Sequence, residues 1–175
     1  YQLANAAVAL AALGELRERL PVGINAIKRG LLEVDWPGRF QVLPGRPTTI
    51  LDVAHNPHAA RALASGLKTM GYHPQTFAVF SLLRDKDIAG VIDAVKDQID
   101  CWYVSGLGMP RGMSGDELAA KLAQANVCGK IVVLPSVAEA YFAACDKASE
   151  NDRIVVFGSF HTVAAAMAAR RQRDR

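Results

Sequence analysis

Short apolar runs alternate with amphipathic segments along this chain from about residue 48 to its end. The runs are apolar at nearly every position, which is typical of strands buried on both faces of a sheet. The segments between them carry apolar residues at three- and four-residue spacing, which predicts helices. Strands are expected over 48–53, 76–82, 101–105, 131–134 and 153–158, and helices over 57–70, 88–99, 114–125, from 136 onward, and 160–171. Strands separated by helices favour parallel pairing with right-handed crossovers.

Caps and turns complete this picture. Ser114 and Ser136 each stand three residues before a glutamate, Glu117 and Glu139, which is the spacing of a capping box. A proline- and glycine-rich turn joins an additional short strand over 40–43 to the strand that begins at residue 48, and so predicts a hairpin. The predicted fold class is α/β. It is a three-layer, Rossmann-like domain with a mostly parallel sheet of about six strands, an N-terminal hairpin and helices on both faces.

The beginning of the chain has a different pattern. Residues 4–16 are rich in alanine and leucine and predict a helix, and residues 24–32 predict a second, shorter helix. Trp36-Pro-Gly-Arg39 is a turn signal and the best candidate for a domain boundary. We therefore expect two regions, 1–35 and 36–175. Because the chain starts at tyrosine inside an apparent helix, we also expect it to be a fragment of a longer protein.

Composition narrows the function classes. A hydrophobic fraction of 51% supports a packed core, and the net charge of +3 reflects four arginines among the last six residues. These arginines lack interleaved aromatic residues, so we interpret them as a solvated helix end and expect no nucleic-acid partner. No apolar stretch approaches the length that membrane insertion requires. Cys101, Cys128 and Cys145 show no zinc-binding spacing and predict free thiols in a reducing cytoplasm.

Polar side chains gather at or just after the carboxyl ends of four of the predicted strands. They include Asp52, His55, Asn56 and His58, the charged run 84–87, the glycine-rich segment 106–112, and Ser159, His161 and Thr162. A doubly wound sheet brings these loops to one rim, outside the carboxyl ends of its strands, where ligands bind. The sequence therefore predicts a functional site at this rim.

Each candidate also has a purely structural interpretation. Asp52 could bind a ribose hydroxyl or a metal, or cap a helix or brace its loop. His55 could bind phosphate or transfer a proton, or be a hydrogen-bonded loop histidine. Ser159 and His161 could cap the last helix, and the charged run 84–87 could be a solvated helix start. GxxxxGK[ST] and GxSxG are absent, which argues against a phosphate loop in this chain and against a serine hydrolase. The histidine spacing does not favour metal binding.

Trp36-Pro-Gly-Arg39 and Leu51-Asp-Val-Ala-His-Asn-Pro-His58 resemble the folylpolyglutamate synthase and dihydrofolate synthase family of the Mur ligase superfamily. Four further segments extend the resemblance over nearly the whole chain: Leu-Ala-Asn-Ala-Ala at 3–7, Asp-Lys-Asp at 85–87, Gly-Met-Pro-Arg-Gly at 108–112 and Gly-Ser-Phe-His-Thr-Val at 158–163. The last is most similar to bacterial bifunctional enzymes. The resemblance implies the C-terminal domain of an ATP-dependent ligase, with residues 1–35 as terminal helices of the central ATPase domain.

The implied reaction belongs to folate biosynthesis and one-carbon metabolism. ATP would phosphorylate a carboxylate of 7,8-dihydropteroate or of a folylpolyglutamate, and L-glutamate would then displace the phosphate. The Mg²⁺ ligands are expected in the missing N-terminal domain, with no metal ligand in this chain. The chain alone is expected to be inactive, and the protein to be a cytoplasmic monomer without membrane partners. Alternatives are a cell-wall Mur-type amino-acid ligase and a non-catalytic nucleotide-binding module.

The resemblance also assigns site residues. Asn5 is expected to contact the adenine of ATP, Arg39 to reach its phosphates as a catalytic residue, and Asp52 to hold the nucleotide through ribose. A carboxamide can pair with an adenine edge, and an always-charged guanidinium suits a transferring phosphoryl group. His55 is expected to be catalytic, near the phosphate or the incoming glutamate. Ser159 and His161 are expected on the glutamate side together with His55.

Overall fold

The computed structural model describes residues 2–34 and 36–173. The chain divides into two compact units, Tyr1–Trp36 and Pro37–Arg175. The first unit contains two helices, α1 (Gln2–Glu15) and α2 (Ile24–Glu33). None of its described side chains is buried, and its leucines are widely exposed, with Leu32 at 86%. Its assignment to an ATPase domain stays a prediction.

The second unit is built on one six-stranded sheet in the order β1-β2-β6-β3-β4-β5. The strands are β1 (Gln41–Leu43), β2 (Thr48–Asp52), β3 (Thr76–Phe80), β4 (Cys101–Ser105), β5 (Lys130–Leu134) and β6 (Arg153–Phe157). β1 pairs antiparallel with β2, as the predicted hairpin requires, and all the other neighbours are parallel. Every residue of β3 and β6 is buried, which explains why residues 77–80 and 154–157 are all apolar.

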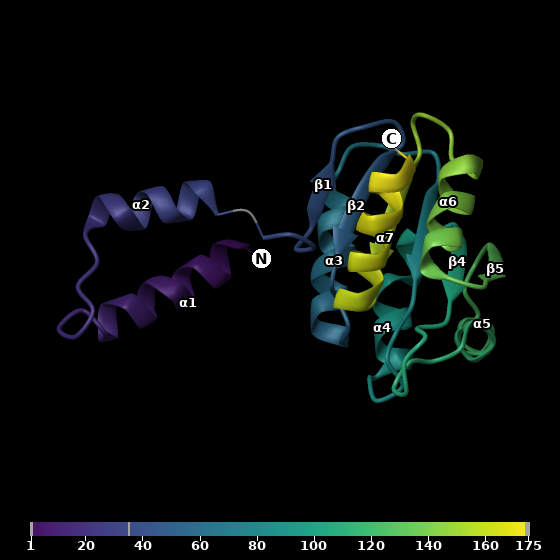
Figure 1. Cartoon of the computed structure of the whole chain (residues 1–175), viewed down its shortest axis with the longest axis horizontal. Coiled ribbons are helices and arrows are strands. Elements are labelled where there is room, and N and C mark those ends of the chain that lie inside the picture. The colour runs from purple at the N-terminus through teal and green to yellow at the C-terminus, as the bar shows by residue number, and fades with distance from the viewer. Residues whose placement is uncertain (1, 35, 174–175) are drawn as a thin grey trace. The chain divides into compact units, whose positions relative to one another are not determined.

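Helices cover both faces of the sheet (Figure 1). They are α3 (Pro57–Thr69), α4 (Ile88–Val95), α5 (Gly115–Gln124), α6 (Val137–Lys147) and α7 (Phe160–Arg173). One hydrophobic core lies under α3, α4 and α5 and includes Leu63, Ile92 and Leu118. The other lies under α6 and α7 and includes Tyr141 and Val163. The predicted three-layer α/β fold is therefore confirmed.

Several local predictions were wrong in detail, including the strand expected over 76–82, which ends at Phe80. The helix expected over 88–99 ends at Val95 and continues as a 3₁₀ turn, Lys96–Gln98. The last strand ends before Gly158, which has φ +115°, a left-handed conformation unsuited to a strand. Ser114 forms the full capping box, whereas Ser136 forms half of one. The Ser136 hydroxyl donates to Glu139 Oε1 at 3.0 Å, and that contact replaces the expected bond from the backbone amide.

Candidate ligand site at the carboxyl ends of the strands

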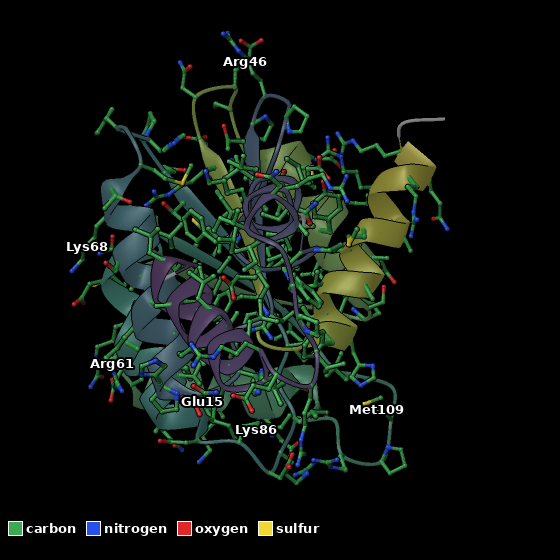
Figure 2. The ribbon with its side chains drawn as sticks, turned by 90° about the vertical axis from the view of Figure 1, so that its left-hand side faces the viewer. Glu15, Arg46, Arg61, Lys68, Lys86 and Met109 are labelled. Carbon is green, nitrogen blue, oxygen red and sulfur yellow. The ribbon has the colours of Figure 1, made fainter. Side chains whose placement is uncertain are left out.

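The strand order places four loops side by side at the carboxyl edge of the sheet. β6 lies between β2 and β3, and β4 follows β3, so the loops after these strands are neighbours. A cavity of about 230 Å³ lies among them, lined by His55, Leu83, Lys86, Arg111, Gly158, Ser159, Phe160 and His161. Figure 2 shows Lys86 and Met109, from two of these loops, at the same end of the unit. The predicted convergence of polar loops at one rim is confirmed.

Asp52 is buried at the end of β2, with 4% of its surface exposed. Its Oδ1 accepts a hydrogen bond from the Ala54 amide at 2.8 Å, and its Oδ2 accepts one from the Phe40 amide at 3.0 Å. Phe40 has φ +49°, an uncommon conformation for a bulky side chain, so this carboxylate holds a strained turn beside Arg39. Asp52 thus braces its loop, and its contact with ribose stays a prediction.

His55 is fixed in orientation by the backbone. Its Nδ1 lies 2.8 Å from the Val53 carbonyl oxygen. A carbonyl oxygen only accepts, so Nδ1 must carry the hydrogen, and Nε2 of the neutral ring is left as a proton acceptor. The imidazole lines the cavity. The geometry therefore suits a group that takes up a proton at Nε2.

Phe160, the first residue of α7, links two of the predicted site residues. The Arg39 guanidinium carbon lies 5.6 Å from the centre of the Phe160 ring, within the range of a cation–π contact. The His55 ring lies 6.4 Å from the same ring. Phe160 is 58% exposed, which is unusual for phenylalanine, a residue that is most often buried. It was not predicted as a site residue, although a large apolar side chain in a polar cap segment was a usable signal.

Ser159 and His161 have different environments. Ser159 is 4% exposed, and its Oγ accepts the Thr162 amide at 3.0 Å and lies 2.7 Å from Thr162 Oγ1. Thr162 Oγ1 donates to the Ser81 carbonyl, so the Ser159 hydroxyl hydrogen points to Thr162 and Ser159 caps α7. His161 is exposed and lines the cavity. Of the two, His161 is better placed to meet a ligand.

Gly158 lets the chain turn between β6 and α7. A Cβ at this position would lie 2.2 Å from the Ser81 carbonyl oxygen, and φ is +115°. Only glycine fits this close approach of two loops. The turn places the start of α7 against the cavity, where its first backbone amides favour an anion.

Charged side chains connect the loops after β3 and β4. Arg84 forms an ion pair with Glu117, and Arg111 forms one with Asp85. The hydrogen bond from Arg84 lowers the pKa of Glu117 to about 2, and the one from Arg111 lowers the pKa of Asp85. Lys86 and Arg111 line the cavity, and they belong to the charged run 84–87 and the glycine-rich segment 106–112 that the sequence placed at this rim. The two ion pairs could not be predicted from a local pattern, because the partners in each pair come from different segments of the chain.

Other candidates lie away from the cavity lining. His58 is exposed on α3, and Asn56 caps that helix by accepting the Ala59 amide at 2.9 Å. Asp87 caps α4 through the Gly90 amide, as its structural interpretation predicted. Asn5 is exposed on α1 in the first unit, so its contact with adenine stays a prediction. Across residues 2–34 and 36–173, no group of three His, Cys, Asp or Glu side chains could hold a metal ion.

Two further predictions concern the whole chain. Cys101, Cys128 and Cys145 are free thiols. Within the described part of the chain, no helix is long and apolar enough to cross a membrane.

The fold and the rim define an α/β domain with a cavity at the carboxyl edge of a mostly parallel sheet, the place where ligands bind in such domains. Residues 38–160 match the family described as Mur ligase, glutamate ligase domain. The chain belongs to this family, which confirms the resemblance found in the sequence.

Individual relatives show which members of this family the chain is similar to. The dihydrofolate synthase/folylpolyglutamate synthase of Escherichia coli (strain K12) is 43% identical over 163 residues, covering 93% of this chain and 37% of the relative. The structure of E. coli FolC in complex with DHPP and ADP has 40% identity and a TM-score of 0.87, covering 98% of this chain and 39% of FolC. A bifunctional folylpolyglutamate synthase/dihydrofolate synthase with Mn, AMPPNP and L-glutamate bound has 43% identity, a TM-score of 0.85, and coverage of 97% and 39%. This chain spans about two fifths of the length of these relatives.

Proposed function

We propose that this chain forms one wall of the ATP site in a ligase that adds L-glutamate to 7,8-dihydropteroate, to folylpolyglutamates, or to both. The observation that carries the proposal is the rim cavity, with His55, Lys86, Arg111 and His161 in its lining and Arg39 beside it on Phe160. A concentration of cationic and proton-accepting groups suits a reaction between anionic substrates. Relatives with bound ADP, AMPPNP, DHPP and L-glutamate support the same reaction.

ATP is assigned to three side chains. Arg39 reaches the phosphates, Asp52 holds the nucleotide through ribose, and Asn5 contacts adenine. Arg39 suits its role because a guanidinium stays charged and can donate several hydrogen bonds to a transferring phosphoryl group. Its contact with Phe160 restricts the side chain before ATP arrives, so less conformational entropy is lost on binding.

His55 is assigned to the second half-reaction. The ammonium group of L-glutamate must lose a proton before it can attack, and His55 Nε2 accepts that proton. The amine nitrogen then forms a bond to the acyl carbon, the bond from that carbon to the phosphate oxygen breaks, and inorganic phosphate leaves. His161 meets a carboxylate of L-glutamate, and Ser159 supports this side of the site by capping α7.

The Mg²⁺ that accompanies ATP is expected to find its ligands in the N-terminal ATPase domain of a longer protein. A relative solved with Mn and AMPPNP supports the need for a divalent ion. The ion would neutralise phosphate charge, while Arg39 contributes charge from this domain. We expect such a protein to be a monomer in the cytoplasm, where free thiols such as Cys128 persist.

The test is ATP-dependent ADP release by the longer protein, with L-glutamate and 7,8-dihydropteroate as substrates. Release should require both substrates, and Arg39→Ala should lower kcat/KM by about 10²- to 10³-fold. Arg46→Ala is the matched control, because Arg46 is also an exposed arginine but lies at the opposite end of the unit (Figure 2).

Asp52→Asn should weaken ATP binding while keeping an oxygen for the loop, whereas Asp52→Ala also removes the brace on Phe40. Equal activity of Arg39→Ala and Arg46→Ala would show that the assigned site is wrong. Ligation of a muramoyl peptide in place of 7,8-dihydropteroate would instead place the chain with the cell-wall ligases.

A further inference from the structure

Two ion pairs join the loop after β3 to the part of the chain that follows β4, but only one of them reaches the cavity. Arg84–Glu117 and Asp85–Arg111 both link the loop after β3 to the segment after β4. Arg111 lines the cavity, whereas neither Arg84 nor Glu117 does. The two pairs are otherwise similar in exposure, with side chains between 41% and 66% exposed. The Arg84–Glu117 pair can therefore only connect these two segments, whereas the Asp85–Arg111 pair also affects the cavity.

Asp85 contacts two cations with one oxygen. Its Oδ2 accepts a hydrogen bond from Arg111 Nη2 and lies 3.8 Å from Lys86 Nζ. Both cations line the cavity, whereas Asp85 does not. The carboxylate is charged at neutral pH, as an aspartate ordinarily is, and the hydrogen bond from Arg111 lowers the pKa of Asp85 further. One negative charge therefore lies behind two positive charges that face the site.

This arrangement has a physical consequence for ligand binding. Lys86 and Arg111 repel each other, and both have long side chains with many rotamers in the absence of a partner. A carboxylate between them reduces the repulsion and restricts their rotamers before a ligand arrives. Because the cations are also partly exposed, at 30% for Lys86 and 66% for Arg111, each keeps donors that can reach an anion in the cavity.

We propose that Asp85 is a positioning residue that holds Lys86 and Arg111 ready to bind one anionic group in the rim cavity. The anion is a carboxylate or a phosphate, two groups that a lysine and an arginine bind in the same way. His55, His161 and the first amides of α7 border the same cavity and favour the same charge. The anion site stands on this geometry alone, and its place in glutamate ligation rests on the proposed function.

The four histidines of the chain provide an internal probe. His55 and His161 line the cavity, whereas His58 and His73 do not. We would titrate the chain with inorganic phosphate and, separately, with L-glutamate into the millimolar range, and follow the imidazole resonances by NMR. Shifts confined to His55 and His161 are expected with at least one of the probes, and the probe that binds more tightly identifies the anion.

Three variants distinguish the positioning of Lys86 and Arg111 from the stability of the loop. Asp85→Asn should raise the dissociation constant about tenfold, because it removes the charge that holds both cations. Arg84→Gln, which breaks the ion pair between the loop after β3 and α5, should change the dissociation constant by less than about twofold. Asp85→Glu should restore most of the affinity, because it restores the carboxylate. If Asp85→Asn acted only by loosening the loop, Asp85→Glu would not restore it. Amide spectra confirm that each variant is folded.

Equal dissociation constants for Asp85→Asn and Arg84→Gln would overturn the proposal, as would titration without any shift at His55 and His161. The proposed function fails separately, if the longer protein does not ligate L-glutamate while the chain still binds an anion in an Asp85-dependent way. Ligation with unchanged KM values for ATP and L-glutamate in Asp85→Asn would leave the function intact and remove the role of Asp85.

Discussion

The two ends of the sheet use charged residues in opposite ways. At the amino end, Arg153 is only 8% exposed and donates to the Thr76 hydroxyl at 2.8 Å and to the Leu67 carbonyl at 2.7 Å. At the carboxyl end, Asp85 and Arg111 pair with 46% and 66% of their side chains exposed. Arg46 and Lys86 mark these opposite ends in Figure 2.

This contrast separates stability from function. A buried charged group must keep its partners, because each unpaired partner left in the protein interior costs free energy. An exposed ion pair contributes little to the free energy of unfolding, and its members can exchange one partner for another. Polar residues at the amino end are therefore expected to matter for folding, and those at the carboxyl end for ligands.

The largest expected effect is on stability, at the amino end. Arg153→Leu removes the donor to the Leu67 carbonyl and the Thr76 hydroxyl and leaves two buried polar groups without it. We expect the free energy of unfolding to fall by about 3 kcal/mol, measured by urea denaturation. Anion binding by the remaining folded protein should not change. A loss below about 1 kcal/mol would contradict the structural role assigned to this end.

An effect of similar size is expected on catalysis at the carboxyl end. His55→Gln keeps a donor for the Val53 carbonyl but loses the acceptor at Nε2, so kcat for ligation should fall about 100-fold. The free energy of unfolding should change by less than about 0.5 kcal/mol. His58→Gln, an exposed histidine on the adjoining helix, is the control and should retain its activity. Equal rates for the two variants would exclude His55 as the proton acceptor.

The smallest effect is expected from the ion pair outside the cavity. The folded state lowers the pKa of Glu117 from 4.5 to about 2, chiefly through the hydrogen bond from Arg84. A depressed folded pKa gives stability that is present above pH 4.5 and is lost as the pH falls toward 2. Glu117→Gln should lack this part of the acid destabilisation, which melting temperatures of both proteins between pH 5 and pH 2 would reveal. Parallel curves would contradict the assigned shift.

Much of the fold could be predicted because local patterns determine it. The β4 strand, Cys101–Ser105, has the predicted limits, and Ser114 forms the predicted capping box. Loop convergence was also predictable, since it follows from parallel strands alone. The family resemblance then added residue roles that periodicity could not supply, such as those of Arg39 and Asp52.

The remaining features depend on contacts between distant parts of the chain. The Arg111 partner comes from another loop, 26 residues away, and no spacing rule connects them. Phe160 belongs to the site because the turn at Gly158 places its ring near Arg39 and His55, which the sequence pattern does not show. Ser136 had the correct local spacing for a capping box, yet its hydroxyl turned to the Glu139 carboxylate. The sequence pattern therefore predicts the helices and strands of the structure, but not which side chains contact one another.

The central position of β6 has a consequence for synthesis on the ribosome. β6 comes last in sequence among the six described strands, yet it pairs with both β2 and β3, joining register partners such as Phe157 and Asp52. Until residues 153–157 emerge, β2 and β3 each lack this neighbour, and the β1–β2 hairpin stays unpaired from β3, β4 and β5. Nascent chains should therefore expose strand edges to chaperones until residues 153–157 have been synthesised. A stop codon shortly before β6 would then remove the middle of the sheet and not merely its edge.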